Sequence, residues 1–287
     1  MLIDKILWAS DGSKDSTEAL KYAELLSKHF KAEIVGLFVI PDYTRSVLSQ
    51  FSSEDRDKFS KWIEETKLKE RKALENIAKT FKEKGTGFKV EITNGIPYEE
   101  ILRMANEERV DLIVMGKGRP VEKYILGGTA LKVLRGSSIP VLTTREAKRN
   151  LEIKKILVPT DLAHGLSKDF KFAVEFAEEF SAVLYLLNVV EVGERGFPLE
   201  IAEQMKAFSL KEVEENIGRT KVRENIVPCV ETSKNAWKGI VKFVEDRDID
   251  LIVMMTYGGG KFKENFIGSV AEKVIQESLC PVITMKP

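Results

Sequence analysis

The sequence lacks several features that would place it in a common functional class. It has only two cysteines, Cys229 and Cys280, which are far apart and form no CxxC pair. This excludes a disulfide framework and a cysteine-based zinc site. No apolar run approaches the roughly 18 residues of a transmembrane helix. The charged residues Asp4 and Lys5 also interrupt the start of the chain, where a signal peptide would be apolar. We therefore expect a cytoplasmic protein with reduced cysteines.

The chain also lacks net charge and is poor in glutamine. Its 45 basic residues balance its 45 acidic residues, so nothing favours nucleic acid or an anionic membrane as a partner. Only three glutamines occur, whereas charged residues, mostly Lys and Glu, make up 31% of the chain. This composition is typical of proteins from thermophiles. We expect a heat-stable protein, and a melting temperature in the ordinary mesophilic range would contradict that expectation.

What the sequence does contain is a strand, a glycine turn and a helix start in close succession. Residues 111–115 read Asp-Leu-Ile-Val-Met, a continuously apolar run typical of a strand buried on both faces. Gly116 and Gly118 follow, and Gly127-Gly128-Thr129 then opens a helix. A helix N-terminus offers unpaired N–H groups and a favourable dipole for an anion. The stretch is therefore a candidate phosphate site.

The same pattern occurs a second time. Asp250-Leu251-Ile252-Val253-Met254 is followed by the glycines of residues 258–260 and then by Gly268-Ser269. The strand lies 139 residues after its first copy, and the glycine–hydroxyl pair lies 140 residues after Gly128-Thr129. A pattern that is weak alone becomes informative when it is repeated.

Two further landmarks extend the repeat to most of the chain. Pro140 and Pro281 are 141 residues apart, and the apolar runs that begin at Lys5 and Lys155 are 150 residues apart. Landmarks in the same order at nearly constant spacing indicate a tandem duplication. We predict domains at residues 1–147 and 152–287, joined by a short charged tether. The first holds about ten extra residues before its Asp111 strand.

Each half alternates strands with helices, which predicts an α/β fold with parallel sheets and right-handed crossovers. In the first half, residues 43–85 predict a loop and a long amphipathic helix, which could cover the nucleotide edge or a partner; a solvated face is the simpler interpretation. Ligands of such sheets bind at the carboxyl ends of the strands. The other expected strands cover residues 5–10, 34–40, 88–93, 140–144, 183–190, 226–230 and 282–285, and further strands are expected at Ile156 and Leu251.

These residues resemble the universal stress protein family. The resemblance covers nearly the whole chain and depends on an Asp after the first strand, the Asp-Leu-Ile-Val-Met strand with its glycine loop, and a Gly-Ser/Thr helix start followed by Pro-Val. It implies a five-stranded parallel, Rossmann-like domain, of the adenine-nucleotide alpha-hydrolase type, present twice. ATP-binding members carry G-x2-G-x9-G-S/T in the loop. The resemblance therefore implies bound ATP or AMP, with or without Mg²⁺.

The resemblance also implies which residues hold the nucleotide. The glycines and the hydroxyl would hold phosphates, and the first-strand Asp and a second-strand Val would lie near the adenosine. The implied residues of the first half are Ser10, Asp11, Val39, Gly116, Gly118, Gly128 and Thr129, and those of the second half are Pro159, Thr160, Asp161, Val189, Gly258, Gly268 and Ser269.

Both halves depart from the family motif. In the first, Gly116 lies one residue too close to Gly118. In the second, Met255 occupies the first glycine position, and its side chain would stand where the backbone should approach the nucleotide. The motif therefore favours the first site, whereas Pro159-Thr160-Asp161 is closer to nucleotide-binding members than Ala9-Ser10-Asp11. The two criteria leave the ranking of the sites open.

Each site residue also has a purely structural interpretation. The glycines could serve tight turns, Asp11 and Asp161 could be helix-entry caps, and Thr129 and Ser269 could only cap their helices. The two valines would be core residues in any case. The repeat and the resemblance together favour phosphate contact for the glycines.

Little in the sequence favours catalysis. His29 and His164 have no metal-ligand spacing and no paired nucleophile. We expect His29 at the surface, near the end of the first helix, and His164 in the loop at the mouth of the second site. No G-x4-G-K-S/T loop is present. The loop Ser10–Ser16 resembles the S-G-G-x-D-S loop of ATP pyrophosphatases, but it has an extra residue and no paired glycines.

Three functions therefore remain. The first is an adenine-nucleotide-binding stress-response sensor or adaptor that is not an enzyme. The second is a weak ATP hydrolase or adenylyl-transferring enzyme, and the third is a dimerisation scaffold without nucleotide. Because the last strand of this family commonly pairs domains, we expect residues 141–144 and 282–285 to pair the halves as a pseudo-dimer, which could double into a homodimer.

Overall fold

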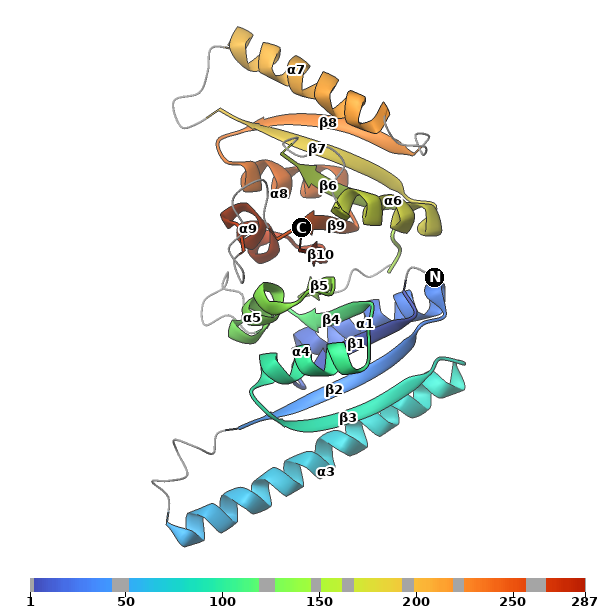
Figure 1. Cartoon of the computed structure of the whole chain (residues 1–287), viewed down its shortest axis with the longest axis vertical. Coiled ribbons are helices and arrows are strands. Elements are labelled where there is room, and N and C mark those ends of the chain that lie inside the picture. The colour runs from blue at the N-terminus through green and yellow to red at the C-terminus, as the bar shows by residue number, and fades with distance from the viewer. Residues whose placement is uncertain are drawn as a thin grey trace.

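The two halves of the chain form one continuous ten-stranded sheet flanked by helices (Figure 1). The structure is a computed structural model, and it confirms the predicted α/β fold with a largely parallel sheet in each half. It describes residues 3–42, 52–118, 127–145, 151–161, 168–192, 199–218, 225–256 and 267–286.

The first half contributes five of the strands and four helices in the described part. In chain order these are β1 (Lys5–Ser10), α1 (Lys14–Phe30), β2 (Glu33–Pro41), α3 (Ser53–Glu83), β3 (Phe88–Gly95), α4 (Pro97–Glu107), β4 (Leu112–Gly116), α5 (Gly128–Gly136) and β5 (Val141–Thr144). The long amphipathic helix that the sequence predicts between residues 43 and 85 is α3.

The second half repeats this order. Its elements are β6 (Lys155–Thr160), α6 (Lys168–Phe180), β7 (Val183–Glu191), α7 (Leu199–Gly218), β8 (Ile226–Ser233), α8 (Ala236–Arg247), β9 (Leu251–Met255), α9 (Ser269–Glu277) and β10 (Val282–Met285). No helix in the described part combines the length and apolar character that a membrane span requires.

The strand order explains how the halves join. The sheet runs β3-β2-β1-β4-β5-β10-β9-β6-β7-β8, with parallel neighbours within each half. The exception is the central pair, because β5 and β10 are antiparallel and Leu142 is the register partner of Ile283. The predicted pairing of the last strands is confirmed. Because this pair is antiparallel, the carboxyl ends of the first-half strands lie at the opposite edge of the sheet from those of the second half.

Helices cover both faces of the sheet. In Figure 1, α5 and α9 lie on the left of the sheet and α1 and α6 on the right, while α3 and α7 lie at the two ends of the molecule. Strand side chains alternate between the faces: Ile6 and Trp8 join the core under α1, α3, α6 and α7, whereas Leu7 and Ala9 join the core under α4, α5, α8 and α9. Each core therefore runs through both halves.

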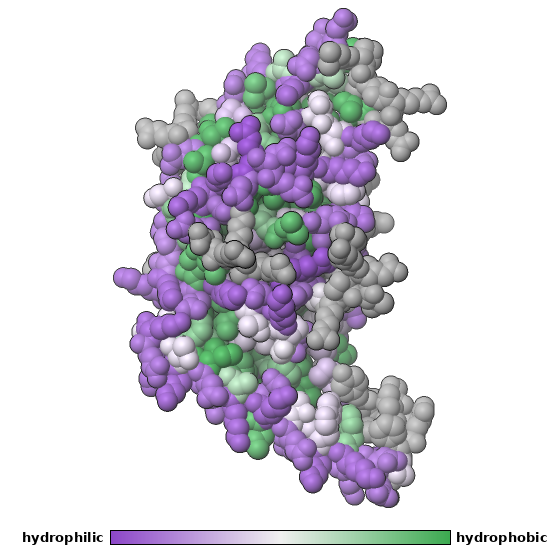
Figure 2. All heavy atoms as spheres, turned by 180° about the vertical axis from the view of Figure 1, so that it is seen from behind, coloured by the Kyte–Doolittle hydropathy of each residue, from purple (hydrophilic) through white to green (hydrophobic). Residues whose placement is uncertain are grey.

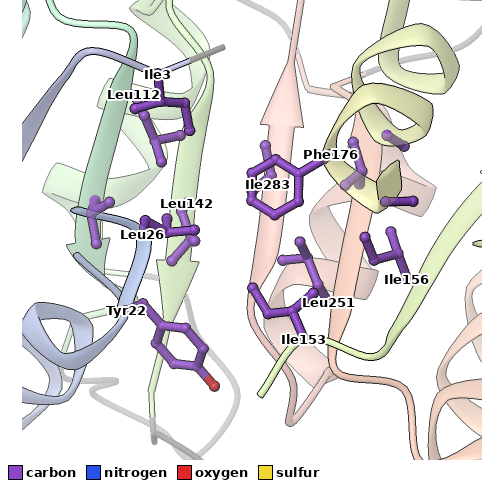
Figure 3. Close-up of a cluster of buried hydrophobic side chains, with 14 of the residues drawn as sticks. Ile3, Tyr22, Leu26, Leu112, Leu142, Ile153, Ile156, Phe176, Leu251 and Ile283 are labelled. Carbon is purple, nitrogen blue, oxygen red and sulfur yellow. The ribbon is translucent and has the colours of Figure 1, made fainter. Parts of the chain in front are cut away.

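The first of these cores crosses the junction between the halves. Figure 3 shows Tyr22, Leu26 and Leu142 of the first half facing Phe176 and Ile283 of the second. Phe30 of α1 also packs against Phe176 of α6, with ring centroids 5.5 Å apart. Burial of these side chains joins the halves by the same hydrophobic effect that stabilises each one.

His29 lies at the surface near the end of α1, as predicted, but it also contacts the second half. Its ring stacks on Phe180 of α6, with centroids 4.0 Å apart and an interplanar angle of 15°, and 31% of its side chain is exposed. Its Nε2 lies 3.9 Å from a carboxylate oxygen of Glu179. His29 is therefore a contact between the halves. The surface elsewhere is largely hydrophilic with scattered hydrophobic residues, as the reverse view in Figure 2 shows.

Candidate functional site

The loop after β1 is shaped by its own polar side chains. Asp11 is exposed and its Oδ1 accepts a hydrogen bond from the Ser13 N–H at 3.0 Å, while Ser10 Oγ accepts one from the Gly12 N–H at 3.2 Å. Gly12 has a φ of 71°, which favours glycine. Ser13 caps α1 by accepting from the Ser16 N–H. Asp11 therefore shapes the turn and is not the cap of the helix.

Gly116 is required by a contact inside the protein. A Cβ at this position would lie 2.8 Å from the carbonyl carbon and Cβ of Asp15 and 2.9 Å from the Ser16 nitrogen. The first turn of α1 therefore packs directly on the end of β4. The missing side chain at Gly116 serves this packing, and the shortened spacing between Gly116 and Gly118 is compatible with it.

Gly118 is also required by the chain itself. Its φ is 82°, and a Cβ there would lie 3.1 Å from the Gly127 Cα. The Gly127 N–H donates a hydrogen bond to the Lys117 carbonyl at 2.9 Å. The two ends of the glycine loop are therefore joined, and the intervening residues 119–126 lie outside the described part.

Gly128 differs from the other glycines of the first site. It is the first residue of α5, it is exposed, and a Cβ added to it would meet no atom within 4 Å. Its φ is not positive. No described side chain caps α5, and Thr129 occupies the second helical position, half-buried. The N–H groups of this helix start therefore have no side-chain cap among the described residues, as an anion site requires.

The structure brings the predicted first-half residues to one edge of the sheet. β1 lies between β2 and β4, with Ala9 opposite Met115 and Ser10 opposite Phe38. Asp11, the end of β4 and the start of α5 therefore follow neighbouring strands. The Gly12 loop is also near α3, because a Cβ on Gly12 would lie 3.9 Å from a Glu70 carboxylate oxygen.

Of the two valines of the predicted site, Val39 lies in the core and Val189 is half-buried against it. Val39 is buried and belongs to the core under α4 and α5. Val189 packs on α8, where a Cβ on Gly239 would come within 2.7 Å of its Cγ1. Their positions fit the structural interpretation that the sequence already allowed for them.

The predicted residues of the second half lie at the opposite edge of the sheet. Pro159 and Thr160 end β6 half-buried, and Asp161 is exposed. Thr160 is held through its carbonyl, which accepts a hydrogen bond from Asn188 Nδ2 of β7 at 2.8 Å. Asn188 is buried and was not predicted, because an Asn inside an apolar strand carries no signal of its partner.

Met255 is accommodated because the second half packs differently at this point. It ends β9, where Gly116 ends β4, and its N–H donates to Asp169 Oδ2 at 3.2 Å. Asp169, in the first turn of α6, is 97% buried. Asp169 is a second residue that sequence reasoning missed.

The helix start of the second half corrects the predicted alignment of the repeats. Gly268 is the N-cap of α9 and its N–H donates to the Thr256 carbonyl at 2.7 Å, as the Gly127 N–H does to Lys117. Gly127 is therefore the counterpart of Gly268, with the same 141-residue spacing as Pro140 and Pro281. Gly128 is the counterpart of Ser269, and Thr129 has no equivalent hydroxyl. The sequence paired Gly128-Thr129 with Gly268-Ser269, one residue out of register.

Ser269 is exposed at the first position of α9, and no described side chain caps that helix. It faces outward from the helix start as Gly128 does in the first half. Gly258 and His164 of the predicted second site lie outside the described residues. Within the described residues, no group of three or more His, Cys, Asp or Glu side chains is placed to hold a metal ion.

Lys117 is the third residue that sequence reasoning missed. It lies between Gly116 and Gly118, is completely buried, and its Nζ donates to the Ser278 carbonyl of the second half at 2.7 Å. A lysine in a polar, glycine-rich loop is ordinarily exposed. The sequence therefore contains no signal for this contact.

Comparison with known proteins finds the same family for both halves of the chain. The model of the Universal stress protein family matches residues 3–145 and again residues 152–286. Universal stress protein MJ0531 of Methanocaldococcus jannaschii is 32% identical over 151 residues, covering 52% of this chain and 85% of that protein. Universal stress protein MJ0577 of the same organism is 30% identical over 163 residues, covering 50% of this chain and 96% of that protein.

A solved structure shares the two-domain architecture. The crystal structure of a universal stress protein from Archaeoglobus fulgidus superimposes with a TM-score of 0.72 over 98% of both chains, at 22% sequence identity. The likeness extends over both halves and therefore shows the fold of the whole chain.

Proposed function

The chain belongs to the universal stress protein family, and we propose that its first half binds an adenine nucleotide, ATP or AMP, at the N-terminus of α5. We propose further that the protein acts as a stress-response sensor or adaptor and not as a catalyst. The described residues near this helix start supply backbone amides, hydroxyls and a carboxylate, which are binding groups rather than a paired nucleophile and base.

The open space at Gly128 carries the proposal. Gly116 and Gly118 must be glycines because of internal contacts or backbone conformation, so they say nothing about a ligand. Gly128 has neither reason, since no atom of the described residues lies within 4 Å of an added Cβ and its φ is not positive. It stands at an uncapped helix start, where bound phosphate would complete the hydrogen bonds of the first turn.

The rest of the site fits the remainder of a nucleotide. Because β1 lies between β2 and β4, a ligand whose phosphates lie at α5 reaches the loop after β1. Asp11 is exposed in that loop, and one of its carboxylate oxygens is used in the turn. The other can accept a hydrogen bond from a sugar hydroxyl. The buried Val39 would support the site only from beneath.

The nucleotide can be identified directly. Freshly purified protein would be precipitated with acid, and the released nucleotide would be identified by mass spectrometry with its molar ratio to protein. We expect about one adenine nucleotide per chain, or binding of added ATP or AMP in a calorimetric titration. Neither released nucleotide nor heat of binding would overturn the proposal and favour the scaffold function. Steady release of ADP during incubation with ATP would instead favour the weak hydrolase.

We also propose that the chain forms a homodimer, for which the paired halves already provide the internal two-domain unit. Light scattering of the purified protein tests this, and a monodisperse monomer would contradict it.

A further inference from the structure

Lys117 links the first candidate site to the second half of the molecule. Its N–H donates to the Thr144 carbonyl at 2.9 Å and its carbonyl accepts from the Gly127 N–H, so its backbone is fixed between β5 and the start of α5. Its side chain crosses the junction and donates from Nζ to the Ser278 carbonyl at 2.7 Å. Ser278 is the C-cap of α9.

The contact is electrostatically suited to the end of a helix. The carbonyl end of α9 carries the negative pole of its dipole, which favours a cation. The Nζ group is nevertheless completely buried. Burial lowers the pKa of the Lys117 ammonium to about 8, Cys280 and Asp15 oppose this change, and Arg145 adds to it. Because burying an ammonium costs free energy, this contact contributes little to stability. What remains is its position, because Lys117 lies beside the glycine loop.

The arrangement is present in one half only. The counterpart of Lys117 is Thr256, whose carbonyl accepts from the Gly268 N–H in the same way. Thr256 is buried, and its Oγ1 has no hydrogen-bond partner among the described residues. The threonine is too short to make the corresponding contact with the end of α5. The duplicated fold is therefore asymmetric at this point.

The asymmetry connects the two candidate sites through α9. Because β5 and β10 are antiparallel, α9 begins at the second site, at Gly268, and ends beside the glycine loop of the first. The second half is anchored to the first-site loop by a charged side chain. No such side chain runs from Thr256 to the first half.

We propose that Lys117 is a positioning residue that holds the start of the glycine loop, between Gly116 and Gly118, against the end of α9, so that nucleotide affinity in the first half depends on the second half. This inference depends on the proposed nucleotide function. Loss of the contact between Nζ and the end of α9 releases this part of the loop and thereby weakens binding.

The test uses the full-length chain with the second site blocked. Ser269→Glu places a carboxylate at the open start of α9, where an acidic residue suits the helix but repels phosphate, so ATP titrations then report the first half. In this background we expect Lys117→Met to lower the affinity for ATP about tenfold, within the usual range of coupling between sites. Lys117→Thr, which copies the second half, should have the same effect.

A matched control distinguishes the loss of loop positioning by Lys117 from the general effect of removing a lysine at the junction between the halves. Lys286 also crosses the junction, and its Nζ donates to the Gly136 carbonyl at 3.4 Å, but it is not part of a glycine loop. Lys286→Met should leave the affinity for ATP within twofold of the parent. An equal loss of affinity in both variants would overturn the assignment to Lys117.

The pH profile distinguishes positioning from a general structural defect. Between about pH 7.5 and 9.5 the parent should lose affinity as the Lys117 ammonium loses its proton, and Lys117→Met should lack that component. The other charged or titratable groups that face Lys117 are Arg145 after β5, Cys280 before β10 and Asp15 of α1. Cys280→Ser removes a group that raises the Lys117 pKa, so it should move the profile toward lower pH without abolishing it.

The outcomes separate this inference from the proposed function. If the Ser269→Glu parent binds no ATP, the proposed function of the first site fails and this inference fails with it. If the parent binds ATP and Lys117→Met binds equally well with the same pH profile, only the inference is overturned. A roughly tenfold loss with a flattened profile supports both.

Discussion

The two halves of the molecule share a topology but differ where each would hold a ligand. β4 ends in Gly116, whereas β9 ends in Met255. The next residues are Lys117 and Thr256, and the helices that follow begin with Gly128 and Ser269. The core strands beneath these positions match closely, with Leu112–Val114 and Leu251–Val253 fully buried. The duplication therefore preserved the packing of the sheet and altered the ends of its strands.

The comparison shows that glycines in one motif can have different causes. Gly116 is fixed by the first turn of α1, which comes within 2.8 Å of its missing side chain. At Met255 the neighbouring helix instead presents Asp169 to the backbone N–H, and a side chain is tolerated. Gly128 is fixed by nothing within the described chain. Only the last of these bears on a ligand.

The largest expected effect sharpens this contrast at Gly116. Gly116→Ala places a Cβ against the backbone of α1, and overpacking of this kind costs about 3 kcal/mol of unfolding free energy. The corresponding change in the second half, Met255→Ala, removes a half-buried side chain and should cost about 1 kcal/mol. Urea denaturation of both variants gives the comparison. Equal losses would contradict the account of α1 packing on Gly116.

The second prediction concerns the buried charge at Lys117. Its pKa of about 8 in the folded protein is below the ordinary lysine value of 10.5, so the unfolded chain binds more protons between these values. The stability of the wild type should therefore rise with pH across that window. Lys117→Met lacks the titration and should be about 2 kcal/mol more stable at pH 7, after allowance for the lost hydrogen bond.

That stability gain should shrink steadily as the pH approaches 10.5. Chemical denaturation of both proteins at several pH values measures the difference. A gain that stays constant with pH would show that the ammonium is not responsible.

The third prediction is the matched glycine substitution at α5. Gly128→Ala should raise the unfolding free energy by about 0.5–1 kcal/mol, because alanine favours the helix and meets no neighbour. Thermal unfolding of Gly128→Ala and Gly116→Ala measures both changes in unfolding free energy, which should have opposite signs. A destabilised Gly128→Ala would indicate a structural reason for this glycine.

The smallest expected effect concerns the stacking of His29 on Phe180 between the halves. A double-mutant cycle of His29→Ala and Phe180→Ala should give a coupling energy of about 0.5 kcal/mol, because the contact is partly exposed. A coupling energy near zero would show that the two side chains contribute to stability independently.

Much of this structure could be predicted from the sequence because local patterns determine it. Continuous apolar runs identified the buried strands, and the repeated landmarks identified the duplication, whereas the pairing of β5 with β10 was implied by the resemblance to the family. The helix starts at Gly128 and Ser269 were found within one residue. The predicted alignment of the two helix starts was wrong by one residue. The glycine pair Gly127-Gly128 allows two alignments, and only the hydrogen bond from the Gly127 N–H to the Lys117 carbonyl distinguishes them.

The remaining features depend on contacts between distant parts of the chain. Lys117 reaches Ser278, Asp169 reaches Met255, and His29 reaches Phe180. Each of these side chains has an ordinary surface explanation in the sequence. The cause of each glycine was equally hidden, since φ and the distance to a neighbouring helix are properties of the folded chain.

The most direct test of the account is a calorimetric titration with ATP of the wild type, Gly128→Glu and Ser269→Glu. Glutamate at the first position of a helix suits its dipole, so both variants should stay folded. We expect Gly128→Glu to lower the affinity of the first half for ATP at least about a hundredfold, the scale of roughly 3 kcal/mol. Ser269→Glu should retain one binding event per chain. Binding by Gly128→Glu with the stoichiometry and affinity of the wild type would contradict the proposed site.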